Sequence, residues 1–199
     1  LERKGVYPNV AAYASHSAMR SVVMGDAGSK REATPEELDA IVALFHECMD
    51  AGAFGLGSST FDNHYGWGGI PVPSRLASDE EFRALARVVA EYGHGSMMAT
   101  CGNRTTIEFL EELANISGRP VVYAPLLHYS NQPERATDIA AACAAACGVG
   151  GASMIAAAGG CSSAAVSPPE LLLPMKVPHA LISSPPPPPP PLGVSGNGG

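Results

Sequence analysis

The sequence predicts an α/β protein: about half of a (β/α)8 barrel, followed by a low-complexity tail. Short apolar runs alternate with capped amphipathic helices over the first 135 residues, and polar residues follow each run. The composition then changes, because residues 136–199 contain three of the 31 charged residues (12 basic, 19 acidic), no aromatic residue and 11 of the 18 prolines. We therefore expect a partial barrel over 1–135 and a disordered or out-of-frame tail over 136–199.

The first two elements are a strand and a helix. Residues 9–14 form an apolar run of the kind found in parallel sheets, whose strands are buried on both faces. Thr34 can cap a helix, Pro35 suits its first position and Glu37 completes a capping box. Gly52 stands where this helix is expected to end. The apolar stripe of the helix is formed by Leu38, Ile41, Val42, Phe45 and Met49.

A second strand and a long loop come next. Residues 53–59 are apolar and small, and residues 60–77 form a loop rich in glycine, proline and aromatic residues. Loops of this length are usually functional or mobile. Ser78 and Glu81 form a second capping-box pattern, and Asp79, Glu80 and Glu81 are interpreted as exposed charges of the first helical turn.

The pattern repeats once more. Strands are expected over 96–100 and 121–127, with a helix between them that begins at 105–108 and ends at Gly118. The order β-α-β-α-β-α-β fits a doubly wound sheet or a (β/α)8 barrel. No GxGxxG follows any strand, so the dinucleotide fingerprint is missing. A full barrel takes about 250 residues, so only half of one fits before residue 135.

Charge and cysteine content exclude several classes of protein. The net charge is −7 and no basic stripe is present, so we expect no nucleic-acid partner. The five cysteines form no CxxC, which argues against a disulfide framework or a zinc ribbon. The chain begins without Met or a signal-peptide pattern, so we expect an internal piece of a cytoplasmic protein.

The tail has two interpretations. Residues 139–169 carry no charge, but their alanines and glycines favour membrane insertion too little, so we expect no membrane span. Seven prolines, 185–191, are typical of an extended segment without a core. The tail is either translated out of frame from a GC-rich gene or a genuine extension that binds a proline-reading module.

The first part resembles the N-acyl-D-amino-acid amidohydrolases, the D-aminoacylase-like family of the amidohydrolase superfamily. The likeness covers about residues 6–135. It rests on the order and spacing of stretches at 9–20, 22–25, 33–38, 51–59, 63–64, 71–74 and 80–87.

This resemblance implies a zinc-dependent hydrolase of non-peptide C–N bonds on a (β/α)8 barrel, acting on N-acylated D-amino acids or similar small amides. Zinc would activate water, and a carboxylate would act as base. The family's His-x-His and catalytic Asp have no counterpart in residues 1–135, so no catalytic residue is named. Cys101 falls near a metal-binding His of the family, and His128 follows the fourth strand; these two are the metal candidates.

Four residues are candidates for substrate binding. Arg20 is suited to a substrate carboxylate, with His16 as its hydrogen-bond partner. Asn63 and His64 lie in the long loop, where they could line the pocket. The plainer interpretations are a strand-end histidine with a surface arginine, and a loop histidine held by local hydrogen bonds.

We thus expect a fragment of a metal-dependent amidohydrolase with a small-molecule amide substrate, inactive on its own because ligands and base are missing. The alternative is a catalytically inactive β/α scaffold or binding module without metal.

Overall fold

The protein contains one parallel five-stranded sheet. We analysed a computed structural model, which describes residues 10–146 and 154–158. The strands stand side by side in their order along the chain, and every neighbouring pair is parallel. They are β1 (Ala14–Ser15), β2 (Gly55–Ser59), β3 (Ser96–Thr100), β4 (Val121–Leu126) and β5 (Met154–Ala158).

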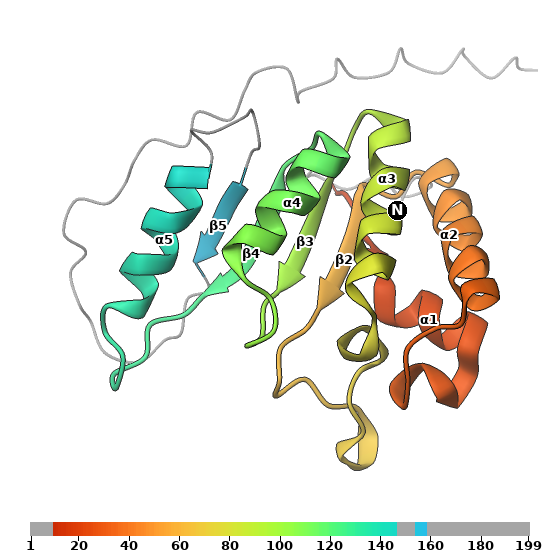
Figure 1. The fold of residues 1–199 in the computed structure, drawn as a ribbon, viewed down its shortest axis with the longest axis horizontal. Coiled ribbons are helices and arrows are strands. Elements are labelled where there is room, and N and C mark those ends of the chain that lie inside the picture. Colours follow the sequence, from red (N-terminus) through yellow and green to blue (C-terminus); the bar gives the residue numbers. More distant parts are fainter. Residues whose placement is uncertain (1–9, 147–153, 159–199) are drawn as a thin grey trace, which may run out of the picture. The chain divides into compact units, whose positions relative to one another are not determined.

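Helices connect the strands (Figure 1). Single helices join β3 to β4 and β4 to β5, whereas the long connection from β2 to β3 also contains two short 3₁₀ turns, Trp67–Gly69 and Pro73–Leu76. Two helices and a 3₁₀ turn, Gly25–Ser29, lie between β1 and β2. The helices are α1 (His16–Met24), α2 (Pro35–Asp50), α3 (Asp79–Tyr92), α4 (Ile107–Ser117) and α5 (Arg135–Ala146).

The strand order of the described part is that of a partial β/α fold. A doubly wound sheet reverses its direction at a switch point, where strand neighbours are not consecutive in sequence. Here every neighbour is consecutive, as in a partial β/α fold that winds in one direction. Among the described strands β1 and β5 each have a single neighbour, so the sheet is open.

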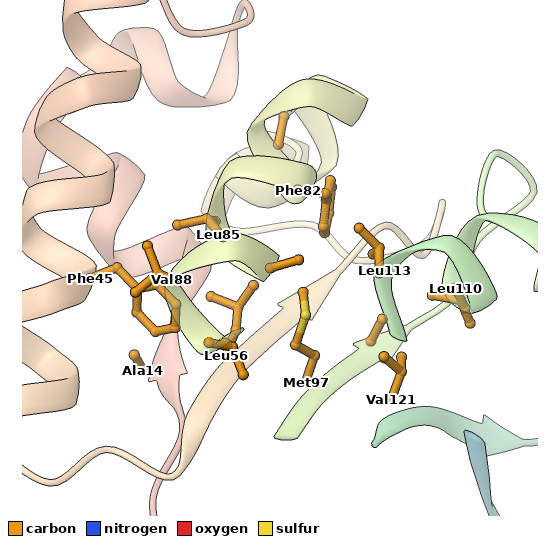
Figure 2. Close-up of a cluster of buried hydrophobic side chains, with 14 of the residues drawn as sticks. Ala14, Phe45, Leu56, Phe82, Leu85, Val88, Met97, Leu110, Leu113 and Val121 are labelled. Carbon is orange, nitrogen blue, oxygen red and sulfur yellow. The ribbon is translucent and has the colours of Figure 1, made fainter. Parts of the chain in front are cut away.

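The core lies between the sheet and its helices. In-register pairing places Leu56, Met97 and Val121 side by side on three strands, and each is at most 3% exposed. They pack in one cluster with Phe45 of α2 and Val88 of α3 (Figure 2). Burying each such side chain contributes roughly 1.5–3 kcal/mol. Buried and partly exposed residues alternate along β2 and β3, so only one face of the sheet is fully packed.

The predicted helix starts are confirmed in two cases. Thr34 and Glu37 form the capping box, with Thr34 N donating to Glu37 Oε2 at 2.8 Å. Ser78 Oγ accepts from the backbone N–H of Glu81, but the Glu81 side chain does not return to the cap. Gly93 ends α3 in the left-handed conformation, with φ 64°.

The first strand is shorter than predicted. The sequence suggests a strand over 9–14, whereas β1 contains only Ala14 and Ser15 and α1 begins at once. Ser15 caps this unpredicted helix, because its Oγ accepts from Ala18 N at 3.4 Å. Residue 9 lies outside the described residues.

The alternation also continues past residue 135, the predicted end of the barrel part. Helix α5 occupies 135–146, and β5 pairs with β4. Alanine favours helices more than any other residue, so a run that resembles low complexity can also form a helix. Grouped by their contacts, the residues of the chain divide into two units, 1–161 and 162–199. The rest of the predicted tail, including the proline run, lies outside the described residues. No helix in the described ranges is long and apolar enough to cross a membrane.

Candidate functional site

Three cavities lie along the ends of β2, β3 and β4. Their volumes are about 230, 310 and 530 Å³, and they share lining residues, with Arg135 common to all three. The walls come from the segments that follow the strands, around residues 61–64, 101–107 and 123–139. Carboxyl ends of parallel strands are where β/α folds bind ligands. We call this group of cavities the strand-end cleft.

Hydrogen bonds hold the loops after β2 and β3 together. Thr60 Oγ1 lies 2.6 Å from Thr105 Oγ1 and accepts from Gly102 N at 3.0 Å, while Asp62 Oδ2 accepts from Asn103 N at 2.9 Å. A Cβ on Gly102 would stand 2.2 Å from the Thr60 carbonyl oxygen, so the close approach requires glycine. The loops after β2 and β3 therefore approach each other closely through their backbones as well as through side-chain hydrogen bonds, and together they form the floor of the cleft.

The predicted pair Asn63 and His64 does reach the cleft. His64 lines the 230 Å³ cavity, and the exposed Asn63 lines the 310 Å³ cavity. His64 Nδ1 lies 2.6 Å from Ser59 Oγ, and the imidazole packs edge-to-face on Phe61. Within the described residues, His64 Nε2 has no hydrogen-bond partner, which leaves it available to a ligand.

Arg135 is a cleft residue that sequence reasoning missed. Its guanidinium lies 5.4 Å from the ring of Tyr129, and Nη1 donates to Gln132 Oε1 at 3.3 Å. Apart from His64 it is the only basic residue among those lining the three cavities in the described part. One signal in the sequence could have pointed to Arg135: it begins an alanine-rich segment that can form a helix. The composition of that segment instead led to its assignment to the tail.

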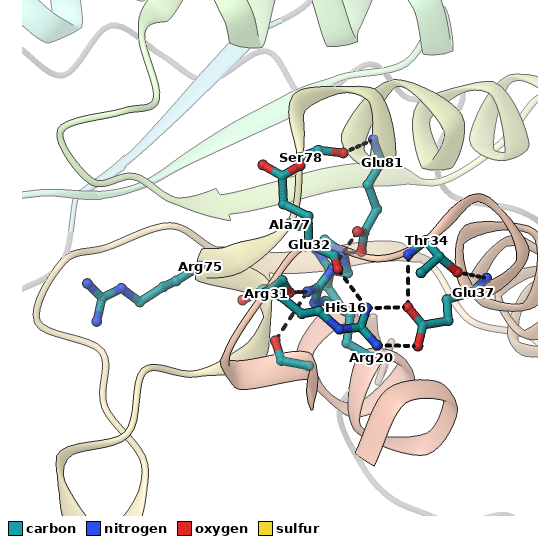
Figure 3. Close-up of polar contacts among 12 residues, drawn as sticks. His16, Arg20, Arg31, Glu32, Thr34, Glu37, Arg75, Ala77, Ser78 and Glu81 are labelled. Carbon is teal, nitrogen blue, oxygen red and sulfur yellow. Dashed lines mark hydrogen bonds and ion pairs between the residues drawn. The ribbon is translucent and has the colours of Figure 1, made fainter. Parts of the chain in front are cut away.

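The other predicted pair, His16 and Arg20, lies in the interior. Both residues are 0% exposed, and so is Glu81, which contacts both (Figure 3). His16 Nε2 lies 2.7 Å from Glu81 Oε1, and Arg20 Nη1 donates to Glu81 Oε2. Arg20 Nη2 donates to the carbonyl oxygens of Gly28 and Arg31 at 3.1 and 2.8 Å. Arg20 therefore has no surface to offer a substrate carboxylate.

Glu81 corrects the prediction that it is an exposed first-turn charge. Burial alone would raise the pKa of Glu81, but the hydrogen bonds to His16 and Arg20 and the charge of Arg20 outweigh it and hold that pKa below its usual value. Burial lowers the pKa of His16, against the opposing effect of Glu81. The group therefore consists of an ionised Glu81 paired with Arg20, beside a neutral His16.

Ser58, His16 and Glu81 form a hydrogen-bond chain in the order of a catalytic triad. Ser58 Oγ lies 2.8 Å from His16 Nδ1, and the other ring nitrogen contacts Glu81. A nucleophile must reach a substrate carbonyl. Ser58 is 8% exposed and stands in register with the buried Ala99, on the face covered by helices. The chain of contacts therefore joins α1, β2 and α3 and serves the structure.

The two metal candidates do not form a zinc site. Burial raises the pKa of the Cys101 thiol to about 12, and Sγ donates to the Ala99 carbonyl oxygen at 3.5 Å. Zinc binds cysteine as a thiolate, so binding at Cys101 would have to release this proton. His128 is exposed, and among the described residues no three His, Cys, Asp or Glu side chains gather. The described residues therefore gather no zinc site of their own.

Comparison with known proteins returns no relative: no family model, no curated protein and no solved structure matches the chain.

Proposed function

We propose that this chain supplies the substrate-binding half of a (β/α)8 amidohydrolase that cleaves non-peptide C–N bonds in N-acyl-D-amino acids or similar small amides. The observation that carries the proposal is the strand-end cleft, where His64 and Arg135 line the same cavity at the ends of three parallel strands. The consecutive strand order and the sequence resemblance support the same assignment.

The cleft has a polar and an apolar part. Arg135 is suited to a carboxylate, because a guanidinium pairs with two carboxylate oxygens at once. Phe61, Tyr123 and Leu127 line the 230 Å³ cavity and suit an apolar acyl chain. His64 Nε2, which has no partner among the described residues, can hydrogen-bond the amide of such a substrate. The described residues thus bind and orient a substrate, and the chain by itself is expected to bind without hydrolysis.

Binding can be measured by NMR with N-acetyl-D-leucine on the isotope-labelled chain. We expect shifts at residues 61–64, 101–103 and 129–135, and a loss of at least about tenfold in affinity for Arg135→Ala, or 1.4 kcal/mol. Arg87→Ala is the matched control, because Arg87 is an exposed helix arginine paired with Glu80 at 2.8 Å. Shifts confined to other surfaces, or equal binding by the two variants, would refute the proposal.

A second candidate is a β/α binding module without metal, favoured because no three His, Cys, Asp or Glu side chains gather among the described residues. Elemental analysis of the purified chain and of any longer parent separates the two functions. Stoichiometric zinc with chelator-sensitive amide hydrolysis in the parent supports the enzyme. A parent that binds the amide without zinc and without hydrolysis supports the module.

A further inference from the structure

Ser59, the last residue of β2, contacts the histidine of the strand-end cleft. Its Oγ lies 2.6 Å from His64 Nδ1 and accepts from the backbone N–H of Phe61 at 3.3 Å. The Ser59 carbonyl oxygen accepts from Ser74 Oγ at 2.7 Å, and Ser59 is in register with Thr100 of β3. The strand and a neighbouring turn therefore fix this serine without help from a ligand.

The imidazole of His64 is held as well. Its ring packs edge-to-face on Phe61, with the two ring centroids 5.2 Å apart. The His64 carbonyl oxygen accepts from Val72 N at 3.3 Å and from Arg75 Nη1 at 3.2 Å. Because the ring and the backbone are both fixed, the contact with Ser59 can decide which ring nitrogen of the neutral imidazole carries the hydrogen.

The hydrogen-bond network assigns that hydrogen to Nε2. A backbone N–H can only donate, so Ser59 Oγ uses one lone pair on Phe61. If His64 Nδ1 carried the hydrogen, Oγ would accept a second time, and its own hydrogen would have no acceptor among the described residues. If Nδ1 is bare, the hydroxyl donates to it and both groups are satisfied. Nε2 is then a donor that no described residue uses.

The buried His16 offers an internal comparison. Its Nδ1 lies 2.8 Å from Ser58 Oγ, and its Nε2 lies 2.7 Å from the ionised Glu81. A carboxylate only accepts, so this neutral ring also carries its hydrogen on Nε2. Glu81 binds that hydrogen in the interior, whereas the equivalent hydrogen of His64 is free for a ligand, because His64 lines the 230 Å³ cavity.

We propose that Ser59 is a positioning residue, which holds neutral His64 in its Nε2–H form so that the imidazole donates to a carbonyl oxygen in the cleft. Arg135 lines the same cavity, and a guanidinium also only donates. Two donors favour a ligand with two acceptors, which an N-acylated amino acid supplies as its amide carbonyl and its carboxylate. This choice of ligand rests on the proposed function, whereas the state of the imidazole does not.

The first measurement is the NMR spectrum of the isotope-labelled ring nitrogens in the full chain without ligand, about two pH units above the ordinary histidine pKa of about 6.5. We expect His64 to carry hydrogen on Nε2 and none on Nδ1. Ser59→Ala should give a mixture of the two forms, and Ser59→Thr, which keeps the hydroxyl, should restore the single form. Ser21→Ala, at an exposed serine of α1, is the control, and the signals of His16 should not change in any variant.

The second measurement compares the affinities of N-acetyl-D-leucine and N-thioacetyl-D-leucine, whose sulfur is a weaker acceptor than oxygen. The unmodified chain should bind the acetyl ligand about three- to tenfold more tightly, the value of one hydrogen bond. Ser59→Ala should bind the two ligands more nearly alike, and Ser59→Thr should restore the difference. A merely structural role for Ser59 would weaken both ligands by the same factor and leave their ratio unchanged.

Two spectra overturn the proposal: hydrogen on Nδ1 of His64 in the unmodified chain, or a single Nε2–H form that persists in Ser59→Ala. An affinity ratio that Ser59→Ala leaves unchanged overturns the carbonyl contact. If Ser59→Ala loses its helical circular dichroism, Ser59→Cys takes its place, because a thiol keeps the size of the side chain and donates weakly. If neither ligand binds the unmodified chain, the proposed function fails, and the ring spectra still decide the role of Ser59.

Discussion

Glu81 brings a negative charge into the interior, where Arg20 balances it. Both side chains are almost wholly enclosed, and the other carboxylate oxygen faces His16. Removing one partner of a buried pair leaves the other charge without compensation, which costs more than the pair itself contributes. The arrangement therefore ties α1 to α3 through a contact that tolerates little change.

The first prediction concerns this pair. Glu81→Gln keeps the shape of the side chain but removes its charge, so the free energy of unfolding should fall by about 3–5 kcal/mol. Urea denaturation followed by circular dichroism measures it. Glu80→Gln is the control, because Glu80 pairs with Arg87 on the surface, where such pairs contribute at most about 1 kcal/mol. Equal losses in the two variants would contradict the buried pair.

The second prediction concerns pH. His16 has a folded-state pKa below 6.5, so the unfolded chain binds its proton first. The stability gained by keeping His16 neutral is present above pH 6.5 and is lost as the pH falls below that value, by at most about 1.4 kcal/mol per pH unit. Glu81, whose pKa lies below 4.5, adds a loss at still lower pH.

His16→Gln isolates that contribution. Urea midpoints between pH 7.5 and 5 should fall less steeply for the variant than for the unmodified chain, because other histidines contribute equally to both. His94→Gln, at an exposed histidine, serves as the control substitution. A slope that is the same in all three proteins would show that His16 takes up its proton as easily when folded.

The burial of Glu81 could have been predicted from the sequence, but its partners could not. Glu81, Leu85 and Val88 recur at i, i+4 and i+7, so helical periodicity places Glu81 on the buried face of α3. Its position in an acidic first turn instead favoured exposure. What no local pattern reveals is the partner, because Arg20 lies 61 residues away and its role depends on how α1 packs.

At the scale of elements, helix starts were the most predictable feature, since a cap is a contact within four residues. Thr34 and Glu37 satisfy each other's backbone donors in α2, and Arg31 pairs with Glu37 beside them. The first strand was less predictable. The local sequence does not distinguish an apolar strand from extended residues that precede it. Only the pairing with β2 shows that β1 contains two residues.

The third prediction tests the cap. Thr34→Ala removes the hydroxyl that accepts from Glu37 N at 3.3 Å, so the free energy of unfolding should fall by about 1 kcal/mol. Thr137→Ala is the matched control on the exposed surface of α5, where alanine suits a helix better and stability should hold or rise slightly. A loss at Thr137 as large as that at Thr34 would argue against the cap as the cause.

At the scale of the whole molecule, alternation predicted the parallel sheet but not its extent. Four strands were expected, but the sheet has five. The fifth was not predicted because α5 and β5 consist largely of alanine, which gives little amphipathic pattern. Their place depends on packing: Cys143 of α5 is 3% exposed, and Ile139 packs against the core. The cleft shows the same limit. His64 follows a predicted strand and was named as a candidate, whereas Arg135 is the last residue of the predicted barrel part and begins a helix that was not predicted.

The fourth prediction locates that boundary by truncation. A chain ending at residue 134 lacks α5 and β5, so it loses the core side chains Ile139 and Cys143 and leaves β4 without its neighbouring strand. Its free energy of unfolding should fall by roughly 2–4 kcal/mol, the value of one or two buried apolar side chains. A chain ending at residue 161 keeps the whole first contact unit and should match the full chain. Urea denaturation of the three proteins decides, because equal stability of the shortest chain would place the boundary at residue 135 after all.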